Sequence, residues 1–239
     1  YDTDDSLRVI KESLKALNMD DKSFPPRSVL GYISRAKDDM QLAEDFLDQA
    51  KAQGDFRLQK IGNVYLAYQK KLWAAGALDF DDIILHTVRL LQKFPEVREY
   101  YQRKFHYVLI DEYQDTNHLQ YLLAALLAGE RKNICVVGDD DQSIYRFRGA
   151  TIENILSFES EYKNARVIRL EQNYRSTGNI LEAANAVIRN NRGRKGKNLW
   201  TDHGEGEKVR FYTAGNEREE GMYVATQLLK AYGEGRQWR

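Results

Sequence analysis

The chain has 239 residues, of which 42% are hydrophobic and three are proline, a composition that excludes a disordered or collagen-like protein. Lysine plus arginine equals aspartate plus glutamate at 36 each, so net charge gives no support for nucleic-acid binding and any such surface must be local. No apolar stretch is long enough to span a bilayer, and the length suits two or three small substructures.

The start of the chain, its cysteine and its histidines indicate its extent, its cellular compartment and whether it binds zinc. Because the chain begins at Tyr1 and has no signal peptide, we expect a piece of a longer protein. The single cysteine, Cys135, cannot form an internal disulfide, and its apolar neighbours predict a buried core thiol in a reducing cytoplasm. The four histidines have no ligand-like spacing, so we infer no zinc site.

The first hundred residues are predicted to be all-helical, because apolar residues recur there at helical spacing. These positions are Leu7, Ile10, Leu14 and Leu17, then Val29, Ile33 and Ala36, then Ile61, Val64, Tyr65 and Tyr68, then Ile83, Ile84, Val88 and Leu91. Pro25 and Pro26 open the second helix and Pro95 starts another. The aspartates from Asp79 to Asp82 are interpreted as structural, supplying N-terminal caps and dipole-favoured charge for the helix that precedes Pro95.

After residue 105 the pattern changes to short β-like runs that alternate with helices. Strands are predicted at 107–111, 134–138, 166–170 and 209–213, and helices near 119–127, 152–162, 180–190 and 217–232. This alternation predicts parallel α/β packing.

The first chemical segment is VLIDEYQDTN at 108–117. Continuous Val, Ile and Leu are typical of a buried parallel strand, and α/β proteins bind ligands at the carboxyl ends of such strands, where Asp111 and Glu112 fall. In nucleotide hydrolysis the first carboxylate would hold Mg²⁺ and the second would accept a proton from the attacking water. The alternative is a helix-capping acidic turn.

The second segment is VGDDDQSIYRFRGA at 137–150, just past the next strand. Gln142 could reach a γ-phosphate or position water, while Tyr145, Phe147 and Arg148 offer groups that stack on single-stranded bases. In the alternative interpretation, Tyr145 and Phe147 are a core pair and the three aspartates form a solvated turn. The aspartate run lacks the later glutamate of an EF-hand loop, so we set calcium aside.

The third segment is LEQNYRST at 170–177, again between a predicted strand and a helix. Arg175 could clamp a phosphate and Tyr174 could stack on a base. The alternative is a turn in which Ser176 or Thr177 caps the helix that follows.

Together these segments resemble motifs II, III and IV of superfamily 1 DNA helicases, most closely those of the UvrD/Rep/PcrA type, although members usually carry Trp at the position of Phe147. The resemblance implies an α/β fold in which an all-helical insertion domain, 1–104, precedes parallel-sheet RecA-like motor-domain parts of the P-loop NTPase type, incomplete at both ends. Residues 105–170 would be the second part of the first motor domain and 171–239 the beginning of the second.

The resemblance also implies an ATP site. Asp111 and Glu112 would form its Mg²⁺ site, with Glu112 acting as the general base. Gln142 and Arg175 would contact the γ-phosphate and complete the catalytic set with Glu112. Tyr174 would stack on adenine. The cofactors implied are ATP and Mg²⁺.

For DNA, the resemblance implies that Tyr145, Phe147 and Arg148 line a single-strand track. The expected activity is 3′ to 5′ translocation on single-stranded DNA with duplex unwinding. Single-stranded DNA and single/double-strand junctions are the expected partners, alongside repair or replication proteins and without a membrane.

One departure from the pattern of this helicase family limits the activity expected of the isolated chain. No Gly-x-x-x-x-Gly-Lys-Ser/Thr phosphate loop occurs in it, so we expect negligible ATP hydrolysis by the isolated chain. The alternative function is a non-catalytic module that binds single-stranded DNA or protein. A nuclease-helicase relative with the same motor also stays open.

Overall fold

The computed structural model describes residues 1–145, 149–191 and 196–237. The chain divides into two compact units, Tyr1–Val167 and Ile168–Arg239. Among the described residues, no helix combines the length and the apolar character needed to cross a membrane.

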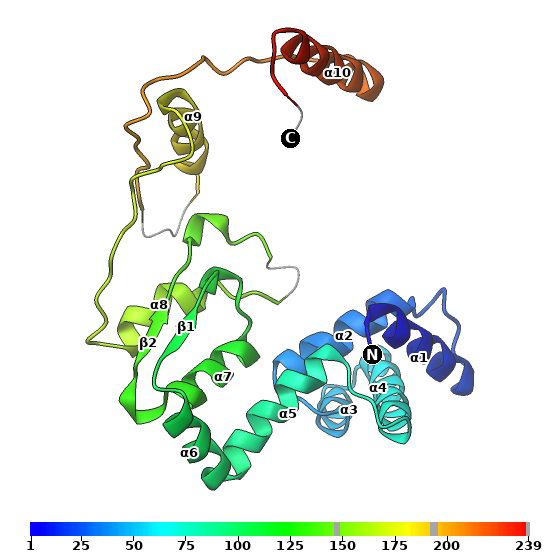
Figure 1. The fold of residues 1–239 in the computed structure, drawn as a ribbon. Coiled ribbons are helices and arrows are strands. Elements are labelled where there is room, and N and C mark those ends of the chain that lie inside the picture. Colours follow the sequence, from blue (N-terminus) through cyan, green and yellow to red (C-terminus); the bar gives the residue numbers. More distant parts are fainter. Residues whose placement is uncertain (146–148, 192–195, 238–239) are drawn as a thin grey trace. The chain divides into compact units, whose positions relative to one another are not determined.

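The first unit contains a helical part followed by a small α/β part (Figure 1). The helical part consists of α1 (Thr3–Ala16), α2 (Pro26–Asp38), α3 (Ala43–Ala52), α4 (Phe56–Ala74), α5 (Phe80–Lys93) and α6 (Pro95–Lys104). The described residues of the α/β part form β1 (Val108–Ile110), the 3-10 turn η1 (Tyr113–Asp115), α7 (His118–Ala128), η2 (Gly129–Arg131), β2 (Ile134–Val136), η3 (Asp140–Gln142) and α8 (Glu153–Glu161).

The helices begin where the sequence supplies caps. Pro26 and Pro95 stand at the first turns of α2 and α6, as predicted. Asp79 caps α5 and forms a capping box with Asp82, which confirms the structural interpretation of these aspartates. Such a cap contributes about 1 kcal/mol to helix stability.

The core of the helical part lies between α1, α2 and α4. Ile10, Ile33, Val64 and Leu72 are at most 1% exposed there. Burying each aliphatic side chain of this size stabilises the fold by roughly 1.5–3 kcal/mol. The apolar periodicity therefore predicted these helices correctly. Helix α3 was not predicted, because its buried face consists of two alanines and one leucine, too weak a pattern to stand out.

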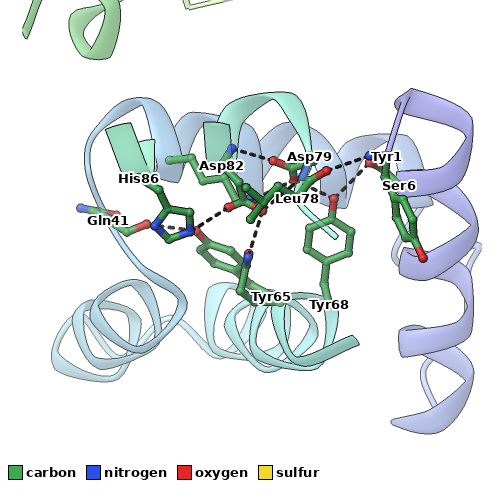
Figure 2. Close-up of polar contacts among 11 residues, drawn as sticks. Tyr1, Ser6, Gln41, Tyr65, Tyr68, Leu78, Asp79, Asp82 and His86 are labelled. Carbon is green, nitrogen blue, oxygen red and sulfur yellow. Dashed lines mark hydrogen bonds and ion pairs between the residues drawn. The ribbon is translucent and has the colours of Figure 1, made fainter. Parts of the chain in front are cut away.

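A buried ionic network joins α2, α4 and α5 beside this core (Figure 2). Lys37, fully buried, lies 2.6 Å from Asp79 Oδ2 and 2.8 Å from Asp82 Oδ1. Tyr68 donates to Asp79 Oδ2 at 2.7 Å, and Gln69 donates to Asp82 Oδ2 at 2.9 Å. Burial alone would raise the pKa of Asp79, but the charge and hydrogen bond of Lys37 hold it below its ordinary value. The network fixes the end of α2 against the start of α5.

Strands β1 and β2 pair in parallel, as the alternating pattern predicted, with Leu109 opposite Cys135. Helix α7 packs against β1 (Figure 1). The prediction of a strand buried on both faces and of a buried core thiol was wrong, because Leu109 is 77% exposed and Cys135 is exposed. Side chains alternate between the faces of a sheet, and these two central residues share the face that the described chain leaves uncovered.

In its described residues, 168–191 and 196–237, the second unit forms the helices α9 (Gly178–Ile188) and α10 (Glu217–Gly233), both near their predicted positions. The strands predicted at 166–170 and 209–213 were wrong, since neither segment belongs to a strand of the structure. An extended segment becomes a strand only when a neighbour pairs with it. The pairing described in this unit is a single parallel bridge between Gln172 and Trp200.

Candidate functional site

The carboxyl ends of β1 and β2 lie next to each other. Beyond the strand pairs, Val137 donates its backbone N–H to Ile110 at 2.8 Å, and Tyr113 donates its own to Val137 at 2.9 Å. These bonds bring the segment that starts with Asp111 against the segment that starts with Gly138. Two of the three predicted chemical segments therefore meet at one sheet edge.

Asp111 and Glu112 are both exposed at this edge. Asp111 Oδ1 accepts the backbone N–H of Glu112 at 2.8 Å. Glu112 has φ +50° and ψ +41°, the left-handed conformation, which is uncommon for a residue with a side chain. Such a conformation costs of order 1–3 kcal/mol and persists only where the surroundings enforce it. The backbone therefore turns sharply at the carboxylate pair instead of continuing the strand.

Gln114 joins the two segments. Its side chain is 1% exposed, its Nε2 donates to Glu112 Oε2 at 2.8 Å, and its Oε1 accepts the N–H of Asp139 at 2.9 Å. Gly138 makes this approach possible, since a Cβ there would lie 2.6 Å from Gln114 Oε1. One buried amide thus sets the position of the Glu112 carboxylate relative to the second segment.

Asp139 organises the turn that carries Gln142. Its Oδ1 accepts the N–H of Asp141 at 3.0 Å, and its Oδ2 accepts Nε2 of Gln142 at 2.6 Å. Gln142 is exposed, one turn beyond the end of β2. Asp139 to Asp141 hold ligand atoms within 4.8 Å of one another, but both oxygens of Asp139 already accept hydrogen bonds. We therefore interpret these aspartates as turn-forming groups.

Sequence reasoning assigned no role to Gln114, and it gave Asp139 a place only in the solvated turn of the alternative interpretation. Both residues act through side-chain contacts that exist only once the two strands are paired. The available signal was local: a glutamine two residues after Glu112, and a glycine at 138 that allows close approach.

The predicted DNA-contacting residues follow this turn. Tyr145 is 38% exposed, so it is not the core residue of the alternative interpretation. It lines a cavity of about 350 Å³ together with residues of α2, α5 and the segment after η1. Phe147 and Arg148 lie outside the described residues.

Tyr174 and Arg175 belong to the second unit, and both are exposed, Tyr174 at 73%. The hydroxyl of Tyr174 donates to Gln172 Oε1 at 2.9 Å. Asn173 Oδ1 accepts the N–H groups of Arg175 and Ser176 at 2.9 and 2.7 Å, which forms a tight turn before α9. The N-cap of α9 is Thr177, one of the two predicted, although its side chain makes no capping hydrogen bond.

The carboxylates fit a divalent metal. Asp111 and Glu112 are exposed, and each has one oxygen that accepts a protein hydrogen bond and a second with no hydrogen bond within the described part of the chain. Mg²⁺ prefers hard oxygen ligands and is commonly bound by one or two carboxylates together with substrate phosphates. Both residues can therefore contribute to a Mg²⁺ site.

Two family models match the chain. Residues 1–163 match the UvrD/REP helicase N-terminal domain, and residues 168–237 match the UvrD-like helicase C-terminal domain.

Curated relatives agree with these models. The chain is 54% identical to the ATP-dependent DNA helicase PcrA of Bacillus subtilis over 235 residues, which are 98% of this chain and 31% of the relative. It is 50% identical to the protein of the same name from Staphylococcus epidermidis and 49% identical to that from Staphylococcus aureus, covering 99% and 100% of this chain and 32% of each relative. The chain thus spans about a third of the length of these relatives.

Proposed function

Because the chain belongs to the UvrD/REP helicase family, we propose that it forms part of an ATP-dependent DNA helicase that moves 3′ to 5′ along single-stranded DNA and separates duplex strands. Residues 1–104 are assigned to a helical insertion domain, 105–170 to the second part of a RecA-like first motor domain, and 171–239 to the beginning of the second. The observation that carries the proposal is the buried Gln114 amide, which joins Glu112 to the turn that holds Gln142.

In this proposal Glu112 is the general base of ATP hydrolysis. Its carboxylate accepts a proton from water as the water oxygen bonds to the γ-phosphorus and the bond to ADP breaks. Gln142, held by Asp139, contacts the γ-phosphate. When bound at Asp111 and Glu112, Mg²⁺ supplies positive charge that offsets the charge of the phosphates.

The remaining proposed ATP contacts are Arg175 and Tyr174. Arg175 contacts the γ-phosphate, which suits a guanidinium that is always charged and binds phosphate oxygens in a fixed geometry. Tyr174 stacks on adenine, and its 73% exposure leaves the ring accessible.

The proposed DNA contacts are Tyr145, Phe147 and Arg148. Stacking of a base on an aromatic ring contributes about 1–3 kcal/mol and tolerates any sequence, as translocation along arbitrary DNA requires. Phenylalanine has a smaller ring than tryptophan and no indole N–H. Base stacking on Phe147 is therefore weaker than in members with tryptophan at this position. The proposed partners are single-stranded DNA, single/double-strand junctions and proteins of repair or replication.

Strand displacement tests this function. The complete protein that contains this chain is given ATP, Mg²⁺ and a duplex with either a 3′ or a 5′ single-stranded tail. We expect displacement from the 3′-tailed duplex and little from the 5′-tailed one. Equal displacement would contradict the direction, and binding without ATP-dependent displacement would leave the non-catalytic module as the function.

A further inference from the structure

Asp38, the last residue of α2, reaches the segment that carries the carboxylate pair. Asn117 Nδ2 donates to Asp38 Oδ1 at 2.6 Å, across 79 residues of sequence. Asn117 is also the N-cap of α7, where its Oδ1 accepts the N–H of Gln120. Asp38 therefore holds the start of α7, and with it the end of the segment that begins at Asp111.

The other oxygen of Asp38 lies against Gly149, just after the proposed DNA-contacting residues. Gly149 has φ +84°, and a Cβ at this position would lie 2.8 Å from Asp38 Oδ2. Both observations require glycine: the backbone conformation disfavours a side chain, and the carboxylate occupies the space that one would need. One carboxylate thus touches both proposed functional segments of the first unit.

The residues that directly follow the second segment are also bonded to the first. Thr151 donates its N–H to Thr116 at 3.0 Å, and Asn154 Nδ2 donates to the Thr116 carbonyl at 3.1 Å. Beside them is the cavity of about 350 Å³ that Asp38, Asn117 and Tyr145 line. Because this pocket is open to solvent, protein atoms do not pack against these groups on that side, and the hydrogen bonds hold them in place.

We propose that Asp38 is a positioning residue that couples DNA binding to ATP hydrolysis. One oxygen of Asp38 holds Asn117 and the other packs on Gly149. Asp38 therefore keeps the end of the Glu112 segment and the end of the Tyr145 segment in a fixed relation. Movement of the segment around Tyr145 on DNA binding is then transmitted to the segment of Glu112. This inference rests on the proposed function, and it assigns a coupling role to the helical part of the unit.

The experiment exchanges the two partners of the hydrogen bond in the complete protein. Asp38→Ala removes the acceptor, whereas Asp38→Asn keeps an acceptor oxygen. Asn117→Asp keeps the helix cap but replaces the donor by a second carboxylate. The double variant, Asp38→Asn with Asn117→Asp, restores one amide and one carboxylate with their places exchanged. Asp21→Ala is the matched control, because Asp21 is an exposed aspartate outside this contact.

The readout is the ratio of ATP hydrolysis with single-stranded DNA to that without it. We expect Asp38→Ala and Asn117→Asp to lower this ratio about tenfold, a typical size for coupling between two sites. Asp38→Asn, the double variant and Asp21→Ala should stay within about twofold of the parent, a small change on the same scale. A merely structural role would lower both rates together and leave the ratio unchanged, which would overturn the inference.

Hydrogen exchange keeps this test separate from the proposed function. If the parent protein shows no DNA-stimulated hydrolysis, the proposed function fails, and the coupling role fails with it. The positioning role of Asp38 is then tested by hydrogen exchange at the backbone amide of Thr151, which donates to Thr116. Faster exchange in Asp38→Ala, with recovery in Asp38→Asn, would support the positioning of this segment by Asp38, and unchanged exchange would overturn it.

Discussion

The buried amide of Gln114 donates to the exposed carboxylate of Glu112 at 2.8 Å. Because the backbone of Glu112 is in the left-handed conformation, its side chain does not continue the alternation of β1. The hydrogen bond from Gln114 holds it in place. The same amide accepts the N–H of Asp139. The geometry of the proposed general base and that of the next strand end are thus set by one side chain.

Replacement of Gln114 by leucine removes both hydrogen bonds at nearly constant volume. We expect kcat for DNA-stimulated ATP hydrolysis to fall about 10- to 100-fold, because misorientation of a catalytic group has effects of this order. The N–H of Asp139 loses its buried acceptor, which costs about 1–3 kcal/mol of stability. Steady-state kinetics and urea unfolding measure the two effects. Gln92→Leu, at an exposed position of α5, is the control, and equal kinetics in both variants would refute the role of Gln114.

Lys37 is expected to be essential for stability. Lys37→Met leaves Asp79 and Asp82 buried without their cation, and removal of one partner from a buried ion pair costs about 3–5 kcal/mol. Urea unfolding of the chain measures this loss. Lys51→Met removes an exposed lysine from its pair with Asp48 and should change little. A similarly small effect at Lys37 would show that the network adds no stability.

Stability should also depend on pH through Asp38. Burial, followed by the charges of Asp81 and Asp39, raises the pKa of Asp38 from 3.8 to about 7. Folding therefore disfavours the charged form, so this residue contributes a penalty that grows as pH rises from 3.8 to about 7. The lowered pKa of Asp79 acts in the opposite sense, because its stabilising contribution is lost below 3.8 as pH falls through the folded-state value.

The comparison of Asp38→Asn with the parent isolates this penalty. We expect the variant to gain unfolding free energy relative to the parent as pH rises from 3.8 to about 7, with no further gain above that range. Urea unfolding at a series of pH values measures the difference. A difference that does not change with pH would contradict the raised pKa.

The isolated 239-residue chain should not hydrolyse ATP. It contains no Gly-x-x-x-x-Gly-Lys-Ser/Thr sequence, and carboxylates cannot replace the backbone amides and lysine that hold the phosphates. Phosphate release by the chain and by the complete protein, at equal concentration with Mg²⁺ and single-stranded DNA, measures this. Turnover by the isolated chain that Glu112→Gln abolishes would show the prediction to be wrong.

The sequence predicted the parts of the fold that depend on local patterns. Helix caps such as Asp79 and starts such as Pro95 act within one turn, and apolar periodicity marks the face that is buried. The meeting of residues 111–113 with 137–139 followed from the rule that parallel strands end at a common edge.

What the sequence did not predict depends on contacts between distant residues. Lys37 meets Asp79 across 42 residues and Asp38 meets Asn117 across 79, and neither pair leaves a local pattern. The wrong strands at 166–170 and 209–213 have the same origin, because β-like composition describes one segment whereas pairing requires two. The exposure of Cys135 depends likewise on what covers the sheet.

The most direct test of the central claim is ATP hydrolysis by the complete protein carrying Glu112→Gln. The substitution keeps the size of the side chain and an oxygen that can accept from Gln114, but it removes the base. We expect the DNA-stimulated rate to fall about 10²- to 10⁴-fold, the usual contribution of a general base, while ATP and single-stranded DNA still bind. A variant that hydrolyses ATP at the parental rate would contradict the assignment of Glu112 and of the site built around it.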